Sequence, residues 1–322
     1  AGTAVITLND AKLWTDGRYF IQAAKQLEGT TVTLMKMFEP GVPSVNEYLE
    51  EILQAGQTLS FDGRVVSVGE GDEYADIAKK KGAKVDYQED LIDEIWTDRP
   101  PLSEEPVWFL EEKYSGESTE SKLSRIRKEM EDAGCDTHIV STLDDICWTL
   151  NIRGNDIDFF PLVLSYAIIK KDSFELYIDE RKLDDKLKTI LKKEGVNLHP
   201  YNAIYEDVKK LPENAAVLID KTKLNYAIFN NIPKSVPIVN KRNPEILMKA
   251  LKNPVEVENI KKAEIKDSIA HIRFMKWLKE NLGKIKITEM SASEKLDEFR
   301  AEMGNFIRDS FEPISSYGPH SA

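Results

Sequence analysis

Few residues in this sequence combine a type and a spacing that could support catalysis. Asp144 and Asp145 form the most prominent carboxylate pair, of the kind that general acid–base catalysis uses. They follow Thr142 at the spacing of a capping box, and the helix dipole favours aspartates in a first helical turn. We therefore interpret the pair as the start of a helix.

The histidines and cysteines form no recognisable ligand pattern. The four histidines are His138, His199, His271 and His320. No two of them have the helical spacing of metal ligands, and Cys135 and Cys147 lack a C-x-x-C spacing. G-x-S-x-G, phosphate-loop and complete G-x-G-x-x-G patterns are also absent from the sequence. We predict two core thiols and no complete catalytic set.

Arg18 has an unusual position in the segment WTDGRYF. It falls in the first turn of an expected helix, where a cation opposes the helix dipole by roughly 0.3–1 kcal/mol. One interpretation is a salt bridge to Asp16, because Arg181 follows Asp179 in the same way. The other is that Arg18 binds a carboxylate or a peptide carbonyl. The residues alone leave both open.

The elements that carry these residues form an internal repeat. Residues 3–27 predict a strand, a turn at Asn9-Asp10, a second strand and a helix, and residues 166–191 repeat the pattern. The expected core faces of the two helices are Phe20, Ala24 and Leu27, and Leu183, Leu187 and Ile190. Asp16 and Asp179 are offset by about 160 residues, as are Asp62 and Asp220, which indicates a tandem duplication of one α/β unit.

The second copy has a front half that the first lacks. Residues 117–134 predict an amphipathic helix that begins after Ser118 or Thr119, presents Leu123, Ile126 and Met130 on one face, and ends at Gly134. A strand and a short helix follow it. Without these elements, the first copy should have an unpaired edge strand and an uncovered sheet face. We therefore expect a chain that is cut at both ends.

Three regions follow from this organisation. The Pro-rich segment 97–106 separates a domain over residues 1–98 from one over residues 107–249. Residues 250–322 begin a third, with a long helix capped by Asn253-Pro254 and running to Gly283, a second helix, and a terminal strand. The predicted class is α/β, with two tandem mixed-sheet domains flanked by helices.

Composition restricts the classes of partner. The chain has 322 residues, 41% of them apolar, and a net charge of −12 that is spread along its length. Nucleic acid or an anionic membrane would require a basic face, so neither is expected as a partner. No apolar run reaches the length of a membrane helix. Two cysteines in a chain of this size favour a reduced, cytoplasmic protein.

Several motifs, in order along the whole chain, resemble one enzyme family. They are WTDGRYFIQAAKQL, TLMKM, EDLIDEIWTDRP, LNIRGNDI with SYAII, and FEPISSYGP. The sequence resembles cytosolic-type aminopeptidase P, an Xaa-Pro aminopeptidase, and WTDGRYF and IWTDRP are the motifs most specific to it.

The resemblance implies two creatinase-like, ribonuclease-H-like N-terminal domains before a pita-bread metallopeptidase domain. That family releases the N-terminal residue from peptides with proline second. It uses two divalent metals, usually manganese, and often forms homodimers. Its metal ligands, two aspartates, a histidine and two glutamates, would lie beyond Ala322, so this chain is expected to bind no metal and to be inactive by itself. Arg18 matches the family arginine that reaches towards the bound peptide, whereas His320 is not the substrate-binding histidine.

A second class of function remains open. Some proteins use this fold without its metals as a peptide- or protein-binding module. A downstream set of metal ligands would indicate the aminopeptidase, and its absence the binding module.

Overall fold

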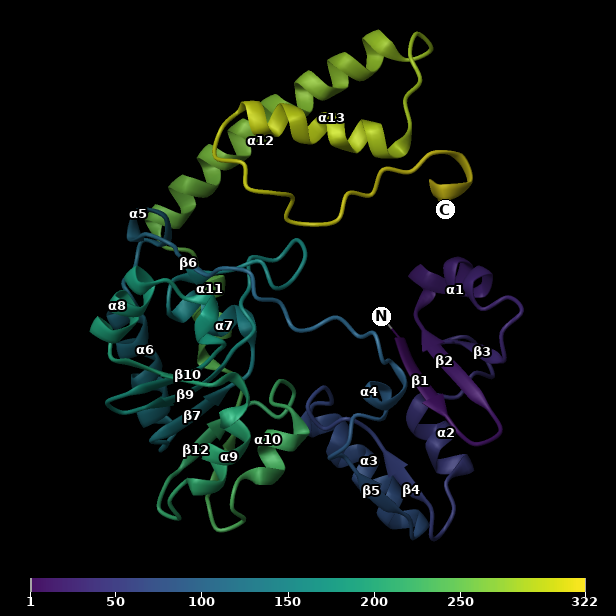
Figure 1. Ribbon diagram of the computed structural model, residues 1–322, viewed down its shortest axis with the longest axis vertical. Helices are drawn as coiled ribbons and strands as arrows, with labels where there is room; N and C mark the ends of the chain where they lie inside the picture. The colour runs from purple at the N-terminus through teal and green to yellow at the C-terminus, as the bar shows by residue number, and fades with distance from the viewer. Residues whose placement is uncertain (1, 322) are drawn as a thin grey trace. The chain divides into compact units, whose positions relative to one another are not determined.

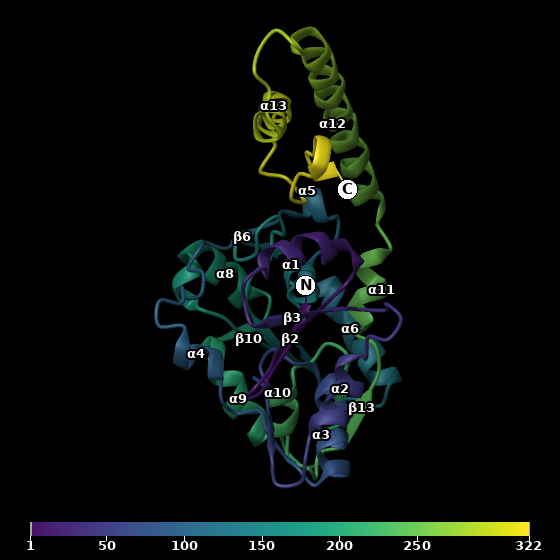
Figure 2. The ribbon, with the colours of Figure 1, turned by 90° about the vertical axis from the view of Figure 1, so that its right-hand side faces the viewer.

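The computed structural model describes residues 2–321 and has the predicted mixed α/β class. It divides into two compact units (Figures 1 and 2). The first comprises the chain up to Arg99 together with Lys221–Asn230. The second comprises Pro100–Asp220 and the chain from Asn231 onwards.

The first unit contains two small sheets. Its elements are β1 (Gly2–Ile6), β2 (Ala11–Thr15), η1 (Gly17–Tyr19), α1 (Phe20–Gln26), β3 (Val32–Lys36), α2 (Val45–Ile52), β4 (Thr58–Ser60), α3 (Val68–Lys81), β5 (Lys84–Asp86) and α4 (Leu91–Ile95). In the first sheet, β1 and β2 form the expected antiparallel hairpin, and β3 pairs parallel to β2. β4 and β5 form a separate parallel pair. Ser44 and Ser67 begin α2 and α3 with full capping boxes.

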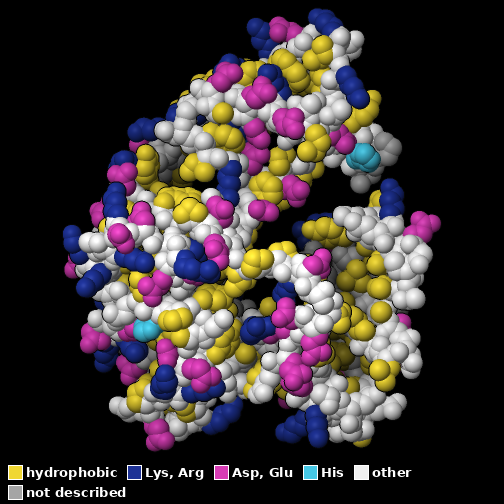
Figure 3. Space-filling view, in the orientation of Figure 1, with side chains coloured by type: hydrophobic (Ala, Val, Ile, Leu, Met, Phe, Trp, Pro, Cys, Tyr) yellow, Lys and Arg dark blue, Asp and Glu magenta, His cyan; other side chains and the backbone are white. Residues whose placement is uncertain are grey.

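The edge of the first sheet is exposed, as the sequence predicts. Within residues 2–321, β1 pairs with β2 alone, and most of its residues are exposed. Apolar side chains gather over the β1–β2 hairpin in Figure 3, where Ile6 is 70% exposed and Leu8 fully so. The core lies on the other side, where Leu49, Leu53 and Ile77 pack together. This sheet therefore has one covered and one open face.

A segment distant in sequence completes the first unit. The backbone N–H of Val68, at the start of α3, donates to Leu224 O at 2.9 Å. The ring of Tyr226 lies edge-on to Phe61 and to Tyr87, with ring centroids 5.5 and 5.0 Å apart. A Cβ on Gly71 would stand 2.1 Å from the Tyr226 ring, so only glycine allows this close approach. Sequence analysis assigned residues 221–230 to the second copy alone and missed this contact.

The second unit is larger. From Trp108 to His199 its elements are β6 (Trp108–Phe109), α5 (Glu112–Ser115), α6 (Thr119–Asp132), β7 (Thr137–Val140), α7 (Leu143–Thr149), β8 (Ile152–Arg153), β9 (Tyr166–Lys170), β10 (Phe174–Tyr177), η2 (Glu180–Lys182), α8 (Asp185–Lys193) and β11 (Val196–His199). It continues with η3 (Tyr201–Ala203), α9 (Ile204–Asp207), η4 (Val208–Lys210), β12 (Val217–Ile219), β13 (Ile238–Asn240), α11 (Pro244–Ala250), α12 (Pro254–Asn281), α13 (Glu289–Glu302) and η5 (Gly318–Ser321). The remaining helix, α10 (Tyr226–Asn231), falls mostly within the first unit.

Sheet topology supports the predicted duplication. In the second unit β9 and β10 are antiparallel and β11 is parallel to β10, as for β1, β2 and β3. β12 and β13 form a parallel pair, as β4 and β5 do. The difference is β7, which pairs with both β9 and β12 and joins the two halves into a six-stranded sheet of order β11-β10-β9-β7-β12-β13. This strand belongs to the front half that the first copy lacks.

The core of the second unit surrounds β7 and α6. Ser118 caps α6, and its predicted apolar face, Leu123, Ile126 and Met130, is buried. All four residues of β7 are buried, because helices cover both faces of this central strand. Cys135 and Cys147 are buried free thiols, which confirms the prediction of core cysteines.

Three sequence predictions are corrected. In α1 the buried residue is Ala23 and not Ala24. Of the second predicted face, Leu183 and Leu187 are buried, although Leu183 precedes α8, and the third buried residue is Leu191 and not Ile190, which is only partly buried. After α13, the described residues contain no strand, so the terminal strand was wrong. A strand needs a partner to supply its hydrogen bonds, and none is present there.

The long helix α12 was located correctly. Asn253 forms a capping box with Glu256, Pro254 occupies the first turn, and the helix ends two residues before Gly283. Figure 2 shows α13 lying beside α12. Among the described residues, no helix is both long and apolar enough to span a membrane.

Two glycines of α3 provide a paired test of the contact with residues 221–230. Gly71→Ala would overlap the Tyr226 ring and should lower the free energy of unfolding by about 1–3 kcal/mol. Gly69→Ala places its Cβ at an ordinary 3.7 Å from Lys221 O and should be neutral or stabilising, by up to about 1 kcal/mol. Urea denaturation of both variants measures the difference. Equal stabilities would contradict the close packing of Tyr226.

The buried Lys122 predicts a pH effect on stability. Its Nζ donates to Trp148 O at 2.7 Å and Asn151 Oδ1 at 2.5 Å, and burial lowers the pKa of Lys122 to about 8. Between this value and the ordinary pKa near 10.4, the unfolded chain holds one proton more than the folded chain. The free energy of unfolding should therefore rise by up to about 1.4 kcal/mol per pH unit in that interval.

Lys122→Met is the matched control for this effect, because it removes the titrating group and keeps much of its volume. Urea denaturation between pH 7 and 10.5 should show the rise in the wild type and a smaller rise in the variant. Parallel pH profiles would refute a depressed pKa.

Candidate functional site

Arg18 lies at the corner where β2 ends. Asp16 follows β2 as the N-cap of η1, and the backbone N–H of Arg18 donates to Asp16 Oδ1 at 3.0 Å. The guanidinium folds back onto the same carboxylate, with Nε donating to Oδ1 and Nη2 to Oδ2, each at 2.8 Å. The salt bridge expected from the sequence is therefore present. It is bidentate, the geometry that suits guanidinium and carboxylate best.

The ion pair leaves much of the guanidinium accessible. The Arg18 side chain is 79% exposed and also contacts its neighbour Tyr19. The hydrogen bonds from Arg18 lower the pKa of Asp16 to about 2, so the carboxylate stays charged near neutral pH. Only Nε and Nη2 of Arg18 donate to Asp16, and Nη1 has no partner among the described residues. Those N–H groups could bind a carboxylate or a carbonyl oxygen.

The same Asp-x-Arg arrangement occurs at two further turns. Arg64 pairs with Asp62 and Arg181 with Asp179, each through its backbone N–H and its guanidinium. The pair is thus a local turn motif and needs no functional cause. The three arginines differ in whether they have a second carboxylate partner. Arg64 also pairs with Asp90 at 3.1 Å, and Arg181 also pairs with Glu104 at 2.6 Å. Within residues 2–321, Arg18 has no such second partner.

The loop after β3 is anchored beside this corner, which sequence analysis missed. The backbone N–H of Met37 donates to Thr15 O at 3.0 Å, so the chain leaving β3 is bonded to the last residue of β2. Further along the loop, Pro43 O accepts from Trp14 Nε1 at 2.7 Å. The sequence shows Pro40, Gly41 and Pro43 but not that β2 and β3 are neighbours, so no local signal identified the contact.

The aspartate pair in α7 has a structural role that differs in detail from the prediction. Thr142 is the N-cap of α7 but makes no capping hydrogen bond, so the predicted capping box was wrong. Its hydroxyl donates instead to the carboxylate of buried Asp145. Lys249 forms ion pairs with both Asp144 and Asp145. Both carboxylates therefore pair with one cation from α11, which gives them a structural role in holding α11 against α7.

His138 belongs to a buried pair and not to an open site. Its Nδ1 lies 3.0 Å from Leu218 O, and its Nε2 lies 3.3 Å from Glu245 Oε2. Both side chains are fully buried. Burial by itself lowers the pKa of His138, but the charge of Glu245 and the hydrogen bonds to Glu245 and Leu218 O together raise it above its ordinary value. The pair fixes α11 against the central strand of the sheet.

The other histidines do not converge either. His199 Nε2 lies 2.7 Å from Glu175 Oε2 at the sheet edge, and His320 Nδ1 lies 2.9 Å from Glu289 Oε2. In residues 2–321, no three His, Cys, Asp or Glu side chains are grouped so that they could bind a metal ion. The described residues therefore do not fit the dimetal site that the family resemblance implies.

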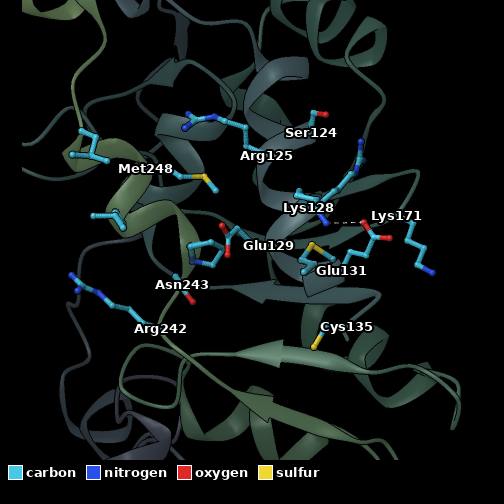
Figure 4. A pocket seen from close by; sticks show the side chains of 15 residues that line it. Ser124, Arg125, Lys128, Glu129, Glu131, Cys135, Lys171, Arg242, Asn243 and Met248 are labelled. Atoms are coloured by element: carbon cyan, nitrogen blue, oxygen red, sulfur yellow. Dashed lines mark ion pairs between the residues drawn. The ribbon is translucent and has the colours of Figure 1, made fainter. Parts of the chain in front are cut away.

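The second unit contains an open groove. It has a volume of about 1060 Å³ and lies between α6 and α11 (Figure 4). Exposed Leu247 and Leu251 line one side, and Lys128, paired with Glu131, lies on the other. No nucleophile–base pair faces it, so we assign it no chemistry.

Comparison with known proteins connects the fold to a family. Residues 1–95 and 98–256 each match the Creatinase/Prolidase N-terminal domain. The chain is 38% identical over 336 residues to a Neurospora crassa protein named "Probable Xaa-Pro aminopeptidase P" and 35% identical over 335 residues to Xaa-Pro aminopeptidase 1 of Dictyostelium discoideum. Both matches cover all of this chain, and 49% and 53% of those proteins.

A solved structure agrees with these matches. The X-prolyl aminopeptidase from Caenorhabditis elegans, described as a cytosolic enzyme with a di-nuclear active site, superposes with a TM-score of 0.88 at 32% identity. The superposition covers 96% of this chain and 52% of that protein. The chain thus spans about half the length of the relatives it matches. Its two matched domains, which together span most of the chain, show that it belongs to the creatinase/prolidase N-terminal domain family, and along its whole length it is similar to proteins named Xaa-Pro aminopeptidase.

Proposed function

We propose that this chain is the N-terminal and middle region of a metallo-aminopeptidase that releases the N-terminal residue from Xaa-Pro peptides. The observation that carries the proposal is similarity over the full chain to proteins named Xaa-Pro aminopeptidase, together with a TM-score of 0.88 to an X-prolyl aminopeptidase. The fold alone would not carry it, because one fold can host unrelated functions.

The reactive centre is proposed to lie in the part of the relatives that this chain does not cover. The C. elegans protein has a di-nuclear site, whereas residues 2–321 contain no group of three ligands for a metal. We propose two divalent metals, manganese in particular, in a pita-bread domain that residues 250–322 begin. The chain by itself would then be inactive and would supply architecture and substrate contacts.

The domain division follows the same proposal. Residues 1–98 and 107–249 would form the two creatinase-like domains, which agrees with family matches over 1–95 and 98–256. The Pro-rich segment 97–106 between them is mostly exposed. We further propose a cytoplasmic homodimer as the full-length form, with neither nucleic acid nor a membrane as partner. Support for the location is the C. elegans relative, which is described as cytosolic.

Arg18 is the residue proposed to contact the substrate. Within residues 2–321, it is the one Asp-x-Arg arginine with a single carboxylate partner, and its exposed N–H groups can donate to a peptide carbonyl or carboxylate. A peptide held in this way would be oriented without any direct role for Arg18 in bond cleavage.

The activity is tested directly with the full-length protein. Arg-Pro-Pro should be cleaved to free arginine and Pro-Pro in the presence of manganese, and residues 1–322 alone should give no product. Chromatographic detection of arginine measures both. A full-length, manganese-loaded protein without turnover would leave the non-catalytic binding module as the better explanation.

Arg18→Ala should weaken peptide recognition in the full-length protein. A hydrogen bond to a charged group contributes about 1.5–3 kcal/mol, so kcat/KM for Arg-Pro-Pro should fall about 10- to 100-fold. Unfolding should remain nearly unchanged, because exposed ion pairs contribute little to stability. Steady-state kinetics and thermal unfolding, measured on the same preparations, separate the two effects.

Arg181→Ala is the matched control for Arg18→Ala. It removes the same turn motif and ion pair from the second unit and should leave kcat/KM within about twofold of the wild type. Equal losses in the two variants, or unchanged kinetics in both, would assign Arg18 to the turn alone.

A further inference from the structure

Phe38 has a backbone conformation that its side chain does not favour. Its φ is +68°, in the left-handed region where bulky residues are rare. The backbone N–H of Glu39 donates to Lys36 O at 3.2 Å, so Phe38 is the third residue of a tight turn, a position with positive φ that normally holds glycine. The ring gains nothing from packing within the described chain, since Phe38 is 89% exposed.

The loop that carries Phe38 is held rigidly at both ends. Met37 N–H is bonded to Thr15 O where the loop begins, and Pro43 O accepts from Trp14 Nε1 where it ends. Trp14 is only 1% exposed and is therefore itself fixed in the core. The exposed ring is thus attached to a well-defined backbone, which lowers the entropy lost when a ligand contacts it.

The position of Phe38 relates it to Arg18. β2 and β3 are parallel, with Thr15 opposite Lys36, so both strands end at the same edge of the sheet. Arg18 follows β2 by three residues, and Phe38 follows β3 by two. In open α/β sheets, ligands bind at the carboxyl ends of parallel strands. This edge therefore presents an unpaired set of guanidinium N–H groups and an exposed aromatic ring.

We propose that this edge recognises the part of the peptide that follows the Xaa-Pro dipeptide. Arg18 binds a carbonyl or the terminal carboxylate, and Phe38 contacts an apolar side chain on the residue after proline. The proposal rests on the function proposed above. The residues on either side of the cleaved bond must reach the reactive centre, which leaves the following residues to contact this unit. A strained, exposed aromatic residue is retained here for binding, since glycine would suit the turn better.

The test uses the full-length protein and two peptides, Arg-Pro-Leu and Arg-Pro-Ser, which differ only after the proline. The wild type should show about tenfold higher kcat/KM for the leucine peptide, as expected for partial burial of a leucine side chain. Phe38→Gly should reduce this preference to about twofold or less. Arg18→Ala should lower kcat/KM for both peptides and keep their ratio.

Thermal unfolding distinguishes this role from a packing role. Phe38→Gly removes the side chain that disfavours the positive φ, so the Tm should stay unchanged or rise. The same substitution should still reduce the preference for the leucine peptide. Val65→Ala is the control, because Val65 is also exposed (78%) and follows the Asp62-Gly63-Arg64 turn of the same unit. It should alter neither the peptide preference nor the Tm.

Each result of the kinetic and thermal measurements either supports or contradicts the proposed recognition of the peptide. A lower Tm for Phe38→Gly would mean that the ring packs against another part of the full-length protein and would overturn the proposal. Cleavage of both peptides with no preference, or with a preference that survives Phe38→Gly, would overturn it while leaving the proposed aminopeptidase intact. If neither peptide is cleaved by the metal-loaded wild type, the proposed function fails and this inference fails with it.

Discussion

The parallel pairing of β2 with β3 is the constraint on which the candidate site depends. A parallel pair requires a crossover, here α1, and it brings the carboxyl ends of two strands to one edge. The bond from Met37 N–H to Thr15 O extends that pairing one residue beyond the strands. As a result, the same pair of strands positions the Arg18 turn and the loop carrying Phe38, although about twenty residues separate them in the sequence. The recognition proposed at this edge thus requires no flexible element.

The same strand arrangement occurs in both units, but within residues 2–321 a central strand joins the two halves only in the second. β7 in the second unit pairs with β9 and β12 and makes one sheet from two halves. In the first unit the two halves form separate sheets. Residues 221–230 pack against α3 there, through Leu224 and Tyr226. The two copies are therefore completed by different segments of the chain.

Buried polar groups in the second unit serve architecture. Asp145 is fully buried and bonded to Lys249, and Glu245 is fully buried beside His138. Burying a carboxylate is costly unless a cation or hydrogen-bond donors compensate it, and in both cases the compensation crosses from α11 to an earlier element. These pairs specify where α11 docks, and α11 leads directly into α12. Their types resemble catalytic residues, but both carboxylates are fully buried, so a substrate cannot reach them.

The sequence by itself determined most of the helices and strands, the repeat, the α6 core face of Leu123, Ile126 and Met130, the cap at Asn253, and the family resemblance. Each of these depends on local propensity, on periodicity or on motifs in order along the chain. Only the tertiary structure decided that β7 unites a six-stranded sheet and that Lys249 pairs with both Asp144 and Asp145. It also decided that Arg18, within the part of the chain that the structure describes, lacks the second carboxylate that Arg64 and Arg181 have. The physical reason is the separation in sequence of the residues that interact. Hydrogen bonds within a turn connect residues two to four apart, so they are recorded as a local pattern in the sequence. Strand pairing and buried ion pairs connect residues tens to a hundred positions apart, and nothing in the local sequence records which partner is chosen.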